Sequence, residues 1–567
     1  MTTIPASAAP PAAASSTDAG RWQIGGIVGI ETDPFTLVRL TKVLGRAGAW
    51  LHEPSTFVGE WDTCFARGVA LADSTAWERS LARGQLAEID GAFAVAWVDA
   101  GGALHLARDA IGERSLFYAP VDGGLVFAST LQAVLTCPFV PHMLNLRSVA
   151  SYLTFGYIPG RETLADGVFE LLPGEEVTFA NGRVTRERFW TAPGEDEPGR
   201  TEARYRRELR TQLEAAVHHR LPHSGPVAAA LSGGIDSSLV VALARRGYDG
   251  PITTYSLSFG PRYPNELAFS RLVAARCRTE HHVLEVSPRA VMDRFDATLA
   301  ALSKPIGEPL TVPNALLFES ASNGAEIVLN GEGGDPCFGG PKNLPMILSE
   351  LYGTGEQSQP GPWQRERAYL RAHRKCYAEL DRMLTADVAS AIADEPLEQS
   401  LSAHLTDPRW TTLVNRLTAL NIEFKGAHHI LAKVDHLSRP HGVRPRSPLF
   451  DRGLVELALR MPARLKLNGA VEKYILKRAV EDVVPAEVID RPKSGMRVPV
   501  EAWLEGRFER FARERLLDGL APYGLVRRTY IEELVKPGQV PPQKRGAKTW
   551  LLLSLEAWLR TVFAADA

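Results

Sequence analysis

Between residues 201 and 330, short apolar runs typical of buried strands alternate with longer segments whose apolar residues have helical spacing. A charged amphipathic helix over Thr201–Arg220 comes first. Strands are then predicted at 226–230, 252–259, 281–286 and 326–330, and helices from Leu239 and at 266–277 and 287–302. This alternation predicts an α/β fold with a doubly wound parallel sheet, whose ligands bind at the carboxyl ends of the strands.

The pattern before residue 130 is different, because brief β-rich segments are separated by Gly or Asp. Strands are predicted at 24–30, 91–98, 104–109, 115–118 and 124–129, with helices at 34–44 and 74–87. A polar, Pro- and Gly-rich stretch at 192–199 is typical of a linker. We therefore expect a first domain at 21–190, a linker at 191–200 and a second domain at 201–567, with a helical C-terminal part.

Composition adds limits to this organisation. The chain has 567 residues and a formal net charge of −2, so it has no overall attraction for nucleic acid or an anionic membrane. No apolar run approaches the ~20 residues that span a bilayer. Five cysteines without CxxC spacing indicate a reducing compartment and no zinc site, and hence a cytoplasmic protein. Residues 1–20 are rich in Ala, Pro, Ser and Thr, and we expect a disordered tail rather than a signal peptide.

The motif with the clearest chemistry follows the first predicted strand of the second domain. It reads Leu231-Ser232-Gly233-Gly234-Ile235-Asp236-Ser237-Ser238. Two glycines allow a tight bend, and the serine hydroxyls and the N–H groups of the following helix form a cradle for phosphate oxygens. No Gly-Lys-Ser/Thr follows, so this is not the Walker A pattern. Asp236 beside an anion site indicates a magnesium ion that bridges its carboxylate and a phosphate.

This motif is similar to the pyrophosphate loop of the N-type ATP pyrophosphatases, and the chain from about Gly25 to Phe508 resembles the asparagine synthetase family. That family cleaves ATP to AMP and pyrophosphate to activate a carboxylate, so the resemblance implies ATP and Mg²⁺ as cofactors. It also implies that the first domain is similar to a glutamine amidotransferase of the N-terminal-nucleophile type, an α/β/β/α sandwich.

The resemblance implies roles for residues beyond the loop. Leu231, Leu257, Asn330 and Gly331 match positions around the adenosine, and Asp335 joins Asp236 at magnesium. Glu332 matches a glutamate near the acyl-adenylate, where β-lactam-forming relatives have tyrosine. Lys473 and Lys493 match two lysines directed at the ATP phosphates and the intermediate. Pro336 replaces a family glutamate.

A segment from Lys433 to Asp451 is similar to the family, but Arg439, Pro440, Arg444 and Pro445 depart from it. Arg444 replaces a glutamate and inverts the local charge, so we expect this segment to select a different acid or acceptor. The pairs His281-His282 and His428-His429 lack metal-site spacing and are expected to be surface or strand histidines.

The first domain lacks the chemistry of a glutaminase. An active one begins with a cysteine whose own amino group acts as base. Gly25 stands at the aligned position, and the family segments that hold glutamine are missing. Cys64 is internal, so we expect it to be structural. We therefore predict an inactive, retained scaffold.

Three functions remain open. The first is an amide ligase that adenylates a small-molecule or peptide carboxylate and transfers it to ammonia or an amine. The second is an intramolecular amide former, such as a lasso-peptide macrolactam cyclase or a lactam synthetase. The third is a catalytically silent scaffold, which intact Asp236, Asp335, Lys473 and Lys493 disfavour. A homodimer is one assembly that stays open.

Overall fold

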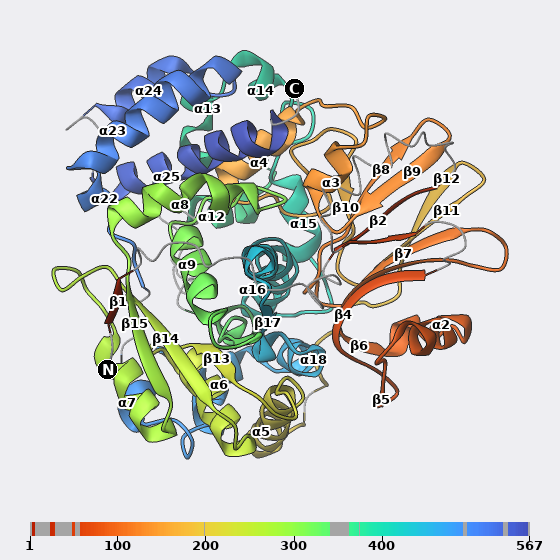
Figure 1. Ribbon diagram of the computed structural model, residues 1–567, viewed down its shortest axis with the longest axis vertical. Coiled ribbons are helices and arrows are strands. Elements are labelled where there is room, and N and C mark those ends of the chain that lie inside the picture. Colours follow the sequence, from red (N-terminus) through yellow and green to blue (C-terminus); the bar gives the residue numbers. More distant parts are fainter. Residues whose placement is uncertain are drawn as a thin grey trace.

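The computed structural model describes residues 3–5, 23–28, 48–51, 57–197, 199–340, 362–372, 375–491, 496–536 and 542–564. Two facing sheets of the first domain lie on one side of the molecule, a parallel sheet lies on the other, and helices cover the top (Figure 1). The helix predicted at 34–44 lies outside these residues. Within the predicted tail, Thr3–Pro5 form a short strand, β1, which differs from the disorder expected there.

The first domain is the predicted sandwich of two largely antiparallel sheets. One has the order β10-β8-β9-β2-β3 and the other β12-β11-β7-β6-β4-β5. Their bounds are Gln23–Val28 (β2), Gly48–Leu51 (β3), Phe57–Ala66 (β4), Val69–Ala70 (β5), Ile89–Val98 (β6), Leu104–Arg108 (β7), Phe117–Val121 (β8), Gly124–Ala128 (β9), Phe169–Glu170 (β10), Glu175–Ala180 (β11) and Arg183–Arg188 (β12). Helix α2 (Ser74–Ala82) packs on β4 through the fully buried Trp77, and α3 (Leu131–Leu135) packs on β8 and β9.

The second domain contains the predicted parallel sheet, in the order β1-β15-β14-β13-β16-β17. Its strands are Val227–Ala230 (β13), Ile252–Ser258 (β14), Glu280–Glu285 (β15), Ile327–Leu329 (β16) and Arg444–Arg446 (β17). The strands predicted at 226–230, 252–259, 281–286 and 326–330 are present, with ends that differ by at most one residue. The predicted helical C-terminal part is confirmed, and it also contains β17, which pairs in parallel with β16.

Helices cover both faces of this sheet, which explains why the central strands β13 and β16 are entirely apolar. Val227 and Ala229 of β13 face the core under α5 (Glu202–His218) and α6 (Ile235–Gly247). Ala228 faces the other core, which contains residues of α8 (Pro288–Ala300) and α9 (Thr311–Ala321). Helix α7 (Leu267–Cys277) lies between β14 and β15 in the chain.

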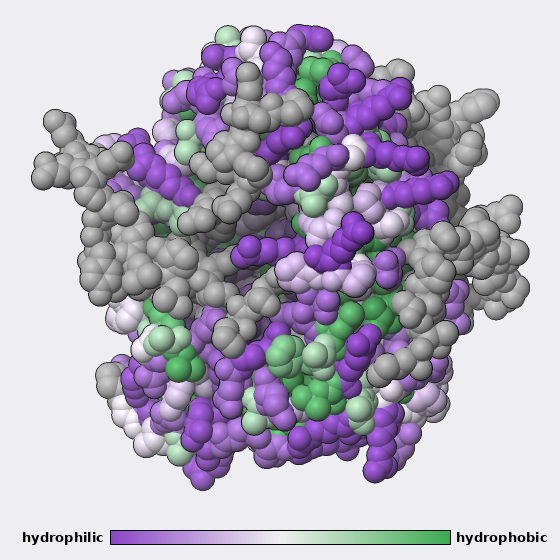
Figure 2. All heavy atoms as spheres, turned by 90° about the vertical axis from the view of Figure 1, so that its left-hand side faces the viewer, coloured by the Kyte–Doolittle hydropathy of each residue, from purple (hydrophilic) through white to green (hydrophobic). Residues whose placement is uncertain are grey.

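The helices after residue 362 complete the second domain. Helix α16 (Leu413–Leu420), a π-helix (Asn421–Leu431) and α17 (Ala432–Ser438) follow one another directly and lead to β17. Near the C-terminus, α25 (Pro542–Trp558) packs against α8 and buries Trp550 and Trp558. Hydrophilic residues dominate the face shown in Figure 2. No helix among the described residues is long and apolar enough to cross a membrane.

Candidate active site

The predicted phosphate loop connects β13 to α6. Gly234 is the N-cap of α6 and provides no side-chain cap. The Ser232 hydroxyl accepts a hydrogen bond from the Gly234 N–H at 3.3 Å, and the Ser237 hydroxyl accepts one from the Ser232 N–H at 3.1 Å. Gly233 has φ +78°, and a Cβ there would lie 2.8 Å from the Ser270 nitrogen of α7. The glycines therefore let the loop bend and pack against α7.

A second loop, which follows β16, lies directly on the first turn of α6. It leads into α10 (Gly334–Phe338). A Cβ on Gly331 would lie 2.4 Å from the Ser237 nitrogen, and one on Gly334 would lie 2.2 Å from Asp236 Oδ1. Only residues without side chains allow this approach. The approach brings Asp335 next to Asp236, although they belong to loops about a hundred positions apart.

Lys473 joins these two aspartates. Its Nζ lies 2.5 Å from Asp236 Oδ2 and 2.6 Å from Asp335 Oδ1, and its side chain is 2 % exposed. Burial alone would lower the pKa of Lys473, but the two carboxylates raise it above its ordinary value. Lys473 also has φ +55°, a left-handed conformation that costs a non-glycine residue ~1 kcal/mol or more and often marks a functional site.

The aspartate pair fits a divalent cation that takes only some of its ligands from the protein. Asp236 Oδ1 is buried and has no hydrogen-bond partner among the described residues. The part of the chain that the structure describes contains no group of three or more His, Cys, Asp or Glu that could hold a metal. Magnesium suits such a site, because it commonly uses one or two carboxylates together with phosphate oxygens and water.

Four residues predicted near the adenosine lie where β13, β14 and β16 end. Leu231 and Leu257 are buried, and the Leu231 N–H donates to the Tyr255 carbonyl at 2.8 Å. Asn330 is buried directly after β16, next to Gly331, and its side-chain Oδ1 accepts from the Glu332 N–H at 3.0 Å. These residues therefore occupy the carboxyl edge of the sheet, as predicted.

Glu332 lies in an acid–base cluster. Burial raises the pKa of Glu332 above its ordinary value, against the opposing charge of Lys433. Lys433 Nζ lies 2.7 Å from Glu308 Oε2, and His429 Nε2 lies 3.1 Å from the same oxygen. Tyr157 stacks on His429 with ring centroids 5.1 Å apart and planes 7° apart. Despite burial, Lys433 and His429 hold the pKa of Glu308 well below its ordinary value.

Sequence reasoning missed Glu308 and His429. The expectation of ordinary histidines was wrong for His428 and His429, which are buried in the π-helix and lie near Glu170 and Glu308. Residues 425, 429 and 433 recur every four positions, and this spacing of Lys, His and Lys was the available signal for a polar helix face. π-Helices are rare and frequently occur at functional sites.

Two predicted positions need separate description. Lys493 lies outside the described residues. Pro336 lies in the first turn of α10, where its missing N–H removes no helical hydrogen bond, so the departure from the family glutamate is locally compatible with the helix.

The arginines that depart from the family lie between the two domains. Arg439 Nη2 lies 3.0 Å from Glu60 Oε1 and 2.7 Å from Asp435 Oδ2. Arg444 begins β17 opposite Ile327, at the end of the strand away from the loop that follows β16. Although burial opposes ionisation, Arg446 above all, with Arg114 and Arg444, lowers the pKa of Asp62 to about 2. Arg439 therefore contacts the first domain, and the role of this segment in selecting an acid or acceptor stays a prediction.

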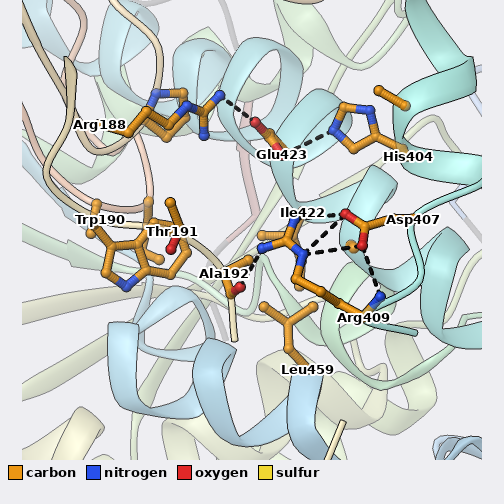
Figure 3. A pocket seen from close by; sticks show the side chains of 15 residues that line it. Arg188, Trp190, Thr191, Ala192, His404, Asp407, Arg409, Ile422, Glu423 and Leu459 are labelled. Carbon is orange, nitrogen blue, oxygen red and sulfur yellow. Dashed lines mark hydrogen bonds and ion pairs between the residues drawn. The ribbon is translucent and has the colours of Figure 1, made fainter. Parts of the chain in front are cut away.

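A separate cavity of about 250 Å³ also lies between the domains (Figure 3). Trp190, Ile422 and Leu459 contribute apolar walls. Its charged groups pair with each other, since Arg188 and His404 both contact Glu423 and Arg409 contacts Asp407. The cavity contains none of the predicted site residues.

In the first domain, Gly25 lies inside β2, paired with Ala128 of β9 and Trp50 of β3. Cys64 is buried, and its thiol donates to the Ala92 carbonyl at 3.4 Å. Burial raises the pKa of Cys64 well above its ordinary value, which disfavours the reactive thiolate.

Comparisons with known proteins match two separate parts of the chain to two family models. A family model described as asparagine synthase matches residues 208–560, and one described as a glutamine amidotransferase domain matches residues 76–190. The chain is 23% identical over 487 residues to "Asparagine synthetase [glutamine-hydrolyzing] 1" of Bacillus subtilis, covering 80% of this chain and 75% of that protein. "Asparagine synthetase [glutamine-hydrolyzing] 3" of the same organism is 25% identical, covering 72% and 67%. "Amidase chyE" of Penicillium rubens is 24% identical, covering 75% and 72%.

Proposed function

The chain belongs to the asparagine synthase family and is an ATP-dependent carbon–nitrogen ligase, and we propose that it activates a carboxylate as an acyl-adenylate and transfers it to ammonia or an amine. The observation that supports this most is the meeting of Asp236, Asp335 and Lys473 beside the phosphate loop. A cluster of fixed charge at the N-terminus of a helix is suited to a triphosphate and its metal.

In the first step, a carboxylate oxygen of the substrate attacks the α-phosphorus of ATP, and the bond to the β-phosphate oxygen breaks. The N–H groups and serines of the loop 231–238 hold the leaving pyrophosphate. Asp236 and Asp335 would hold Mg²⁺, and the ion would supply positive charge to neutralise the phosphates. Lys473, with Lys493 as its proposed partner, adds fixed positive charge, and such groups are each worth ~100–1000-fold in rate.

In the second step, the nitrogen nucleophile attacks the acyl carbon, loses a proton, and AMP leaves. Glu332 is the proposed group at this reacting centre, because it follows Asn330 and Gly331 at the carboxyl edge. A carboxylate whose pKa is raised by burial is a stronger base than an ordinary one, which suits a proton acceptor. Lys433 and Glu308 fix the charge around it.

We propose that nitrogen does not come from glutamine hydrolysed in the first domain. Glycine at position 25 has no side chain to act as nucleophile. The thiol of Cys64 is buried and hydrogen-bonded, which supports a structural role. The first domain then serves the second through the ion pairs between them.

The test is AMP and pyrophosphate release by the full chain with a panel of carboxylic acids. Each acid is combined with ammonium, with glutamine, or with no added nucleophile. The proposal expects AMP formation that depends on the acid, with amide product from ammonium or an amine but not from glutamine. Product in the reaction without a nucleophile would instead identify the intramolecular alternative.

Asp236→Ala is the matched variant, because its carboxylate lies at the predicted metal site. It is expected to lose ATP–pyrophosphate exchange while keeping its thermal unfolding temperature within a few degrees. Exchange that continues at the wild-type rate with the true acid would contradict the assignment.

A further inference from the structure

Arg491 lies beside the phosphate loop, and the functions described above give it no role. Its Nη1 lies 2.8 Å from Glu266 Oε1, and both side chains are 10 % exposed. Its guanidinium also lies over the Phe269 ring, 4.5 Å from the centroid. Glu266 is the N-cap of α7 and Phe269 lies in its first turn, so one rigid helix end fixes the guanidinium in position and orientation.

The guanidinium of Arg491 lies close to Gly234 at the start of α6, as the position of a hypothetical Cβ on this glycine shows. A Cβ on Gly234 would lie 3.3 Å from Ser232 Oγ and 3.7 Å from Arg491 Nη2. The side chain of an N-cap residue normally reaches the first N–H groups of its helix and accepts a hydrogen bond from them. Gly234 makes no such bond. The start of α6 therefore presents N–H donors next to a serine hydroxyl and a guanidinium.

We infer that Arg491 binds the β- and γ-phosphates of ATP, and the released pyrophosphate, across the N-terminus of α6. The inference rests on the proposed function, because it assigns a residue to the same nucleotide site. The first N–H groups of α6, the Ser232 hydroxyl and the guanidinium of Arg491 are hydrogen-bond donors on this side of the loop, and such a set is complementary to phosphate oxygens.

The ion pair with Glu266 is compatible with this function. Arg491 contacts Glu266 through Nη1, while Nη2 is the guanidinium atom that lies nearest the Cβ position of Gly234. A guanidinium presents donors on both terminal nitrogens in a planar fork, so it can bind a carboxylate through one and a phosphate through the other. Lys473, by contrast, contacts the loop through Asp236. The two cations therefore reach the nucleotide through different parts of the loop.

The experiment compares ligands that do and do not contain the proposed contact atoms. Affinities of the full-length protein for Mg-ATP, Mg-pyrophosphate and AMP are measured by isothermal titration calorimetry. Arg491→Ala is expected to weaken ATP and pyrophosphate binding by about 10–100-fold, the effect of losing charge-assisted hydrogen bonds. AMP lacks the β- and γ-phosphates, so its affinity is expected to stay within about twofold.

Two further variants separate this role from a structural one. Arg491→Lys keeps the charge but loses the fork, and it is expected to bind ATP with an affinity between those of wild type and Arg491→Ala. Arg478→Ala is the matched control, because Arg478 forms an exposed ion pair with Glu481 on the helix that follows Lys473. Arg478→Ala is expected to bind all three ligands as wild type does.

Equal weakening of ATP and AMP, or ATP binding by Arg491→Ala that matches Arg478→Ala, would overturn the inference. If Arg491→Ala does not fold, the same ligand comparison with Arg491→Lys decides the matter. A wild-type protein that binds neither ATP nor pyrophosphate overturns the proposed function as well. Wild-type binding that is lost in Asp236→Ala but kept in Arg491→Ala overturns only the role of Arg491.

Discussion

Charged side chains gather in two regions of the molecule, the interface between the domains and the carboxyl edge of the parallel sheet. The two regions differ in how completely these charges are paired within the protein. At the interface, Arg108 and Lys304 both contact Glu170, and all three side chains are buried. At the carboxyl edge, Asp335 is 39 % exposed, and Asp236 keeps a buried oxygen with no hydrogen-bond partner among the described residues. Charged groups that are paired within the protein hold the two domains together at the interface. The polar group at the carboxyl edge that has no hydrogen-bond partner among the described residues is suited to a ligand.

The strongest test of this contrast removes one charge from the interface. Asp62→Ala would leave Arg446 buried without the carboxylate that now lies 2.7 Å from it. Breaking a buried pair in this way costs about 3–5 kcal/mol, so the free energy of unfolding in urea is expected to fall by that amount. Asp99→Ala, at an exposed pair with His105, is the control and is expected to cost less than about 1 kcal/mol. If the two variants lose the same unfolding free energy, the buried pair at the interface contributes no more to stability than an exposed pair.

The matching change at the carboxyl edge should affect activity rather than stability. Asp335→Asn keeps the size of the side chain but removes a charge next to Lys473. ATP–pyrophosphate exchange is expected to fall about 100–1000-fold, because a fixed electrostatic contact to the reacting phosphates is lost. Since Asp335 is partly exposed, the free energy of unfolding should change by less than about 1 kcal/mol. If Asp335→Asn loses several kcal/mol of unfolding free energy and keeps the wild-type exchange rate, Asp335 has a structural role like that of the interface residues.

A smaller effect is expected from changing the packing between the two loops. A Cβ on Gly334 would lie 2.2 Å from Asp236 Oδ1, so Gly334→Ala must displace that carboxylate. We expect a cost of about 1–3 kcal/mol in unfolding free energy and a lower exchange rate. Gly324→Ala is the control, because no atom lies within 4 Å of the added Cβ there. The expectation fails if both variants behave alike.

The smallest expected effect is a pH dependence at the interface. Burial raises the pKa of Glu113 to about 7, despite its contact with Arg220. A raised pKa in the folded state gives stability that is present near pH 4.5 and lost as the pH rises through 7. Glu113→Gln cannot ionise, so its stability relative to wild type should increase by roughly 1 kcal/mol between pH 6 and pH 7. Parallel stability curves for the two proteins would contradict this.

The parallel sheet and the phosphate loop could be predicted because their signals are local. Each apolar strand before residue 330 is a short run bounded by Gly, Pro or polar residues, and Ser232–Ser238 form one continuous motif. β17 could not be predicted in this way, because Arg-Pro-Arg has no apolar pattern. Its identity as a strand comes from pairing with β16, which is a tertiary interaction.

The residues missed at the site are held by contacts between distant positions. Glu308 meets Lys433, and Arg491 meets Glu266 beside Gly234. No periodicity in one segment carries this information, because each pair comes together only when several helices pack on the sheet. The segment that contains Arg439 and Arg444 was predicted to select the acid or acceptor, because the sequence does not show that Arg439 meets Glu60 of the first domain.

The late position of β17 in the chain has a consequence for biosynthesis. The first domain contains hairpins such as β6–β7 and β8–β9, whose strands emerge from the ribosome close together and can pair during translation. Strand β16, in contrast, can pair with its second neighbour, β17, only after residues Arg444–Arg446 have been synthesised. Closing so long a loop is slow, because chain entropy is lost before contacts form. Newly made protein should therefore acquire its sandwich first and the complete carboxyl edge of its parallel sheet last.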